Sequence, residues 1–221
     1  MKRWAALVVL LYLFILVALT PPFILVAFHP STTVRDALSA LCAWEYWLAL
    51  GVVVLAQAML LLVPVEQSMG RPTSRRSVLW PILASGLMAG LLGVGAMISI
   101  DEFLRKEKAS LVETVLPWGV LLLLWAAWTL VFYRASRSTA PIDLVTQQCR
   151  YLLRGSILEL LVAVPTHIVA RARDYCCAGF STFLGIAFGV SVMLFSFGPG
   201  VFFLFAARWK RLHPQPARGS M

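Results

Sequence analysis

The residues best suited to chemistry gather in one polar stretch of the C-terminal third. Glu159, His167, Cys176 and Cys177 follow one another there, with Cys149 nearby in the sequence. Carboxylate, imidazole and thiolate groups bind zinc, copper or iron, and adjacent thiols can also take part in thiol exchange. The set His167, Cys176, Cys177 and Glu159 is therefore a candidate site for a transition metal or for redox chemistry.

The same residues also have a structural interpretation, which we favour. Their spacings match no established metal motif. A Cys-Cys pair at the start of an apolar helix packs as two small, apolar-tolerant residues, and Glu159 can pair with Arg154 or Arg171 without further function. We assign no catalytic or cofactor-binding residue, and the sequence favours a protein that is not an enzyme.

The elements that must position these residues are long apolar runs. The chain of 221 residues is 60% hydrophobic and 13% charged, whereas soluble domains average about 45–50% and about 25%. A helix needs roughly 20 apolar residues to cross a bilayer, and five runs reach that length: 4–28, 46–65, 78–100, 114–133 and 178–207. The sequence predicts an all-α, polytopic membrane bundle, with one domain over 1–207 and a disordered basic tail over 208–221.

The segment 155–174 leaves the topology open between five and six spans. Its central apolar stretch of about 14–16 residues barely crosses a bilayer. On a helical wheel its polar and small residues share one side, which suits an amphipathic surface helix or a span with a polar face turned inward: Glu159, Ala163, Thr166, His167, Ala170, Arg171 and Arg173. We favour the surface helix slightly, because of its short length and flanking arginines.

Basic residues predict the orientation. The formal net charge is +9, and the bases lie in short loops beside apolar runs, which indicates contact with lipid headgroups rather than nucleic acid. With the N-terminus in the cytoplasm, nine Lys and Arg residues of the loops up to residue 155 lie inside and four outside. This pattern suits a bacterial cytoplasmic (inner) membrane.

Small and polar residues within the runs predict how the helices pack. Gly86 and Gly90, Ala89 and Gly93, and the series Ser181, Gly185 and Gly189 each recur four residues apart. That spacing allows helix backbones to approach closely in a membrane. Gln57 is the strongly polar residue deep in the second run, and we expect it to make an interhelical hydrogen bond.

These observations favour a scaffold, accessory subunit or assembly factor of a membrane complex, with the bilayer and other membrane subunits as partners. The first alternative is metal or redox handling by His167, Cys176 and Cys177. The second is a small-solute transporter with Glu159 and Arg171 along its path, which requires six spans. Apart from Glu159 the spans hold no acidic residue, so a proton- or cation-coupled pump would have to use that group.

Overall fold

The computed structural model describes residues 2–27, 33–68, 75–104, 111–137, 139–172 and 179–212. Within these ranges the chain is helical and contains no strand. The helices are α1 (Lys2–Ala27), α2 (Val34–Ser39), the 3-10 turn η1 (Ala40–Cys42), α3 (Trp44–Leu60), α4 (Leu62–Ser68), α5 (Arg75–Leu104), α6 (Leu111–Ala135), α7 (Pro141–Arg171) and α8 (Phe180–Leu212). The predicted all-α membrane bundle is confirmed.

Among the described residues, six helical segments are long and apolar enough to cross a membrane. They are Arg3–Leu25, Trp44–Gln67, Ser77–Leu104, Trp118–Ala135, Pro141–Arg171 and Thr182–Trp209. Five of them coincide with the predicted apolar runs, give or take a few residues. The second is formed by α3 and α4 together, which meet at Leu61.

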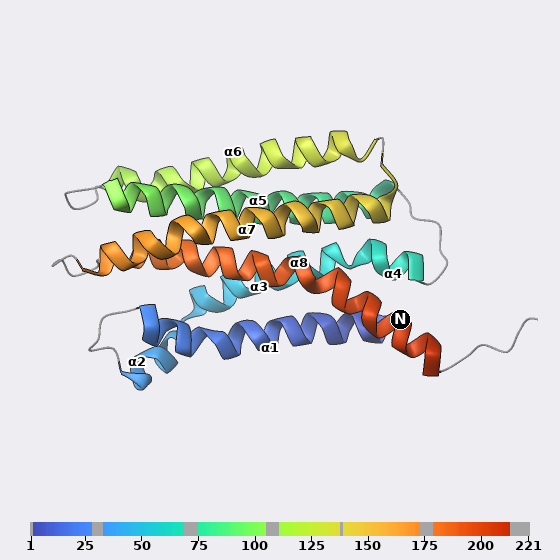
Figure 1. The fold of residues 1–221 in the computed structure, drawn as a ribbon, viewed down its shortest axis with the longest axis horizontal. Helices are drawn as coiled ribbons and strands as arrows, with labels where there is room; N and C mark the ends of the chain where they lie inside the picture. The colour runs from blue at the N-terminus through green and yellow to red at the C-terminus, as the bar shows by residue number, and fades with distance from the viewer. Residues whose placement is uncertain are drawn as a thin grey trace, which may run out of the picture.

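The segment Pro141–Arg171 bears on the choice between five and six spans that the sequence left open, because its length and composition suit a span, whereas the sequence slightly favoured a surface helix. Helix α7 begins at Pro141, fourteen residues before the predicted start at 155, so its 31 residues give a length of ~46 Å. It lies alongside α5 and α8 within the bundle (Figure 1). The predicted start at residue 155 was too late because the sequence analysis measured only the apolar part of the helix, whereas α7 also includes the polar residues that precede it.

Helix α5 lies at the centre of the fold, where it packs against α6 on one side and against α7, α8 and α3 on the others. Helix α6 packs against α5 and makes no comparable contact with any other helix. Helix α1 completes the opposite side of the bundle by packing on α8 and α3 (Figure 1). The main buried apolar core lies between α1, α3, α4, α5, α7 and α8, and it includes Phe132 of α6.

The N-terminus and the end of α8 lie at the same end of the bundle (Figure 1). The Trp4 ring lies 5.3 Å from that of Phe205 and 5.9 Å from that of Trp209, between centroids. Helix α8 bends in its last third, near Pro199, toward the start of α1 (Figure 1). It remains helical to Leu212, so the first residues of the predicted tail belong to the helix.

Candidate functional site

The inward face of α7 carries a series of buried polar side chains. Gln148, Ser156, Glu159 and His167 are all buried and lie within about one third of the helix circumference. The intervening Ala163 and the following Ala170 are also buried, as the helical wheel predicts. Arg171, which the wheel places on the same side, is exposed. This face meets α5 and α8.

Glu159 occupies a space that glycines of the two neighbouring helices provide. Its side chain is only 4% exposed. A methyl group on Gly95 of α5 or Gly185 of α8 would lie 3.1 or 3.2 Å from Glu159 Oε1, and one on Gly189 of α8 would collide with Glu159 Oε2. The carboxyl group therefore packs directly against the backbones of α5 and α8, at positions where both helices have glycine.

Several oxygen atoms lie close to this point, and none of those described forms a hydrogen bond with the carboxyl group. Both Glu159 oxygens and the Ser99 hydroxyl are buried and have no hydrogen-bond partner among the described residues. Ser99 Oγ also borders Gly185, and the Gly95 carbonyl oxygen lies 3.0 Å from the position of a Gly185 methyl group. A carboxyl, a hydroxyl and a carbonyl form a set of oxygen groups that can share a proton or another hard cation.

His167 fastens the end of α7 to the start of α8. Its Nδ1 lies 2.8 Å from Thr182 Oγ1 and 3.1 Å from the Gly179 carbonyl oxygen. Because the Thr182 hydroxyl donates to the same carbonyl at 2.9 Å, it accepts from His167 Nδ1–H, which assigns the tautomer. Gly179 has a φ of +86°, a conformation that glycine adopts without strain.

The structure does not bring the predicted metal ligands together within the part of the chain that it describes. Glu159 and His167 are eight residues apart on α7, a rise of about 12 Å. No group of three His, Cys, Asp or Glu side chains in the described ranges could hold a metal ion. Cys176 and Cys177 lie outside the described residues, so the metal site remains a prediction. Cys149 is a free cysteine on α7.

Two interhelical features were not apparent from the sequence. The Ser85 hydroxyl of α5 donates to Gln148 Oε1 at 3.3 Å, and Ser99 of α5 and Glu159 of α7 both border Gly185 of α8. Only the small-residue spacing in α5 and α8 could have indicated where the carboxyl group would lie. The expected hydrogen bond of Gln57 is absent, since neither amide atom has a partner among the described residues, and the amide packs against Gly198 of α8.

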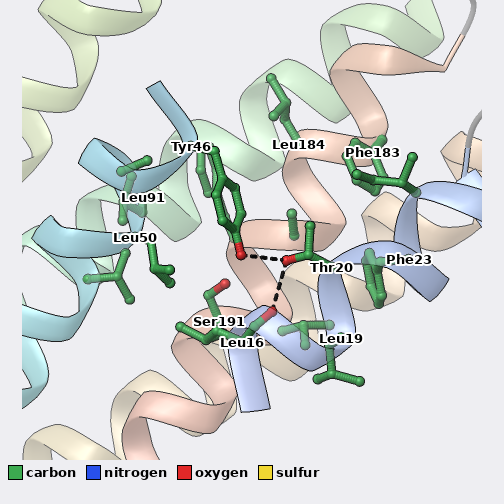
Figure 2. A pocket seen from close by; sticks show the side chains of 16 residues that line it. Leu16, Leu19, Thr20, Phe23, Tyr46, Leu50, Leu91, Phe183, Leu184 and Ser191 are labelled. Carbon is green, nitrogen blue, oxygen red and sulfur yellow. Dashed lines mark hydrogen bonds between the residues drawn. The ribbon is translucent and has the colours of Figure 1, made fainter. Parts of the chain in front are cut away.

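A separate apolar pocket of about 280 Å³ lies between α1, α3, α5 and α8. Figure 2 shows its polar edge, where the Thr20 and Tyr46 hydroxyls lie 2.9 Å apart and Thr20 donates to the Leu16 carbonyl at 2.8 Å. The other lining side chains are almost all aliphatic or aromatic, among them Leu50, Phe183 and Leu184. The pocket suits an apolar chain and offers no charged group to a polar solute.

No protein-family model, curated protein or solved structure matches the chain.

Proposed function

We propose that the protein is an accessory or scaffold subunit of a complex in a bacterial cytoplasmic membrane, with its N-terminus in the cytoplasm. The observation that carries the proposal is an arginine face on α7, formed by Arg150, Tyr151 and Arg154. All three residues are exposed on the outside of the bundle. Arg154 lies one turn after both Arg150 and Tyr151, so it neighbours each of them on the helix surface.

The contacts between α5 and α7 fix the depth of this face. Gln148 lies beside Ser85, a methyl group on Gly155 would lie 3.1 Å from Leu92 Cδ1, and Glu159 borders Gly95. The arginines are therefore level with residues 85–95 of α5, an uncharged stretch in the middle of the candidate span Ser77–Leu104.

Two arginines at that depth are unfavourable in contact with lipid tails. Insertion measurements give about 2.5–3.5 kcal/mol for one arginine at the centre of a helix, and such residues nearly always face protein or water. A partner helix that carries a carboxylate would pair with the guanidinium groups, for which bidentate geometry is available. This supports a protein partner with an acidic residue within its span.

Photo-crosslinking in living cells tests the proposal. A photoreactive amino acid replaces Tyr151, which is 51% exposed, and a second variant carries it at Leu123, an exposed position on α6. We expect one discrete adduct from position 151, with a membrane protein whose crosslinked segment contains Asp or Glu, and none from position 123.

Matched arginine variants then test the pairing. In the background of the crosslinker at 151, Arg150→Ala with Arg154→Ala should reduce the adduct several-fold. The control, Arg134→Ala with Arg137→Ala, removes an exposed pair from the end of α6 and should leave the adduct unchanged. Adducts with lipid alone, or an adduct that both double variants preserve, would refute the proposal.

A further inference from the structure

The buried carboxyl group of Glu159 is not part of the arginine face, because Glu159 lies on the buried side of α7. Among the described residues, no side chain of opposite charge bonds to it. Residues 180–207 of α8 contain no charged residue, and α5 presents Gly95 and Ser99. Among the described residues, the other buried titratable side chains of α7 and α5 are His167, which is bonded to Thr182, and Glu102, three residues beyond Ser99 on α5.

The surroundings suit a neutral carboxyl group and not a carboxylate. An ionised carboxylate buried without donors or a counter-charge costs so much free energy that such a group takes up a proton instead. The backbone N–H groups of α5 and α8 at this depth are engaged within their own helices. By contrast, a neutral carboxyl group has no net charge and a single O–H to satisfy, and the two oxygens that border Gly185 with it, the Ser99 hydroxyl and the Gly95 carbonyl, are hydrogen-bond acceptors.

We propose that Glu159 is a proton-binding site inside the membrane, and that the contact between α7 and α8 at Gly185 and Gly189 depends on the bound proton. In the packed arrangement the carboxyl O–H bond is intact. When that bond breaks, the proton passes to water and the carboxylate remains. Because the glycine surfaces cannot solvate the charge, α8 must separate from α7 locally and admit water. Protonation and helix packing are thereby linked.

A lipophilic carbodiimide, dicyclohexylcarbodiimide, tests the proposal on the full-length protein in lipid nanodiscs. The reagent reacts with a protonated carboxyl group and forms a stable acylurea, which peptide mass spectrometry locates. We expect labelling at Glu159 that falls about tenfold per pH unit once the group ionises, as for a single proton. Glu159→Gln should abolish this label, whereas Glu45→Gln, at the exposed start of α3, should leave it unchanged.

Infrared difference spectra between low and high pH provide a second measurement, which does not depend on access of the reagent. At pH values at which the exposed carboxyl groups are ionised, the wild-type protein should still show the carbonyl band of a protonated carboxyl group, and Glu159→Gln should lack that band. Hydrogen exchange should in parallel show faster exchange in residues 182–192 of α8 at high pH, in the wild type only.

Three outcomes would overturn the inference. The first is a wild-type spectrum without the carboxyl band at any pH at which the protein stays folded. The second is protection of Glu159 from the carbodiimide by sodium ions at constant pH, which would indicate a metal-cation site instead. The third is hydrogen exchange in α8 that responds to pH equally in wild type and Glu159→Gln, since the helix contact would then be independent of the proton.

Discussion

Gly189 leaves no room for even one additional carbon atom. A methyl group there would collide with Glu159 Oε2 and would lie 2.9 Å from Leu160 Cδ2. Gly189→Ala should therefore destabilise the bundle, by about 1–3 kcal/mol for an overpacked position. Gly119 on α6 has nothing within 4 Å of that position, so Gly119→Ala should be neutral or stabilising by about 0.5–1 kcal/mol. Unfolding in detergent compares the two, and equal stabilities would contradict this description of the site.

For Gln57 we expect the opposite effect on stability, because its replacement should stabilise the protein. Its amide is fully buried and has no hydrogen-bond partner among the described residues. Gln57→Leu removes the unsatisfied group at similar volume and should stabilise the protein by about 1–3 kcal/mol. Gln148→Leu, which breaks the bond from Ser85, should not. If the same unfolding assay shows Gln57→Leu to be the less stable variant, the amide must have a partner of another kind.

At this scale the sequence predicts some features and misses others, for one physical reason. The azimuth of Glu159 and His167 on α7 follows from the 3.6-residue period. The close packing at Gly86, Gly90, Gly185 and Gly189 follows from their spacing, and it is confirmed. Which helix faces which residue depends on contacts between distant segments. The approach of Gly95, Ser99 and Gly185 to Glu159, and the fully buried amide of Gln57 beside Gly198, could not be derived from local pattern.

Among the elements, α7 shows the limit of hydropathy most clearly. Its start at Pro141 suits helix initiation, because proline lacks the N–H that the first turn leaves unsatisfied. The sequence analysis missed this start because residues 143–154 include several polar and charged side chains, which are unusual in a lipid-exposed helix. Arg150 and Arg154 are among the residues that made the predicted span too short, and with Tyr151 they form the arginine face. An error in the sequence prediction thus marks a surface that lipid alone does not explain.

A single substitution should weaken the packing of helix α6 against α5. Its contact with α5 runs along Gly86, Gly90 and Gly93, and Trp125 Nε1 donates to the Leu83 carbonyl at 3.0 Å. A methyl group at Gly86 would collide with Thr129 Oγ1 and lie 3.1 Å from its backbone N. Gly86→Val should therefore increase deuterium uptake in residues 118–135 and leave α7 and α8 unchanged. Gly51→Val, in open space on α3, is the control; uniform loosening in both variants would argue against an independently packed α6.

The whole molecule is a bundle in which the start of α1 and the end of α8 lie at one end (Figure 1). Six candidate spans are an even number, so both termini should face the same compartment if all six cross. The basic residues support this arrangement, because Arg3, Arg134 and Arg208 then lie on the side that the positive-inside rule assigns to the cytoplasm. Five spans would place Arg208, Lys210 and Arg211 outside, against that rule.

Reporter fusions distinguish these topologies directly. With six spans, alkaline phosphatase fused after Met221 should be inactive and green fluorescent protein at the same position fluorescent, because both would lie in the cytoplasm. Phosphatase fused after Ala172, at the end of α7, should be active, because α7 would end outside the cytoplasm. Fusion after Arg137, before α7, is the control and should be inactive. An active phosphatase at Met221 would mean that α7 does not cross, and Glu159 would then lie outside the membrane interior that the proton site requires.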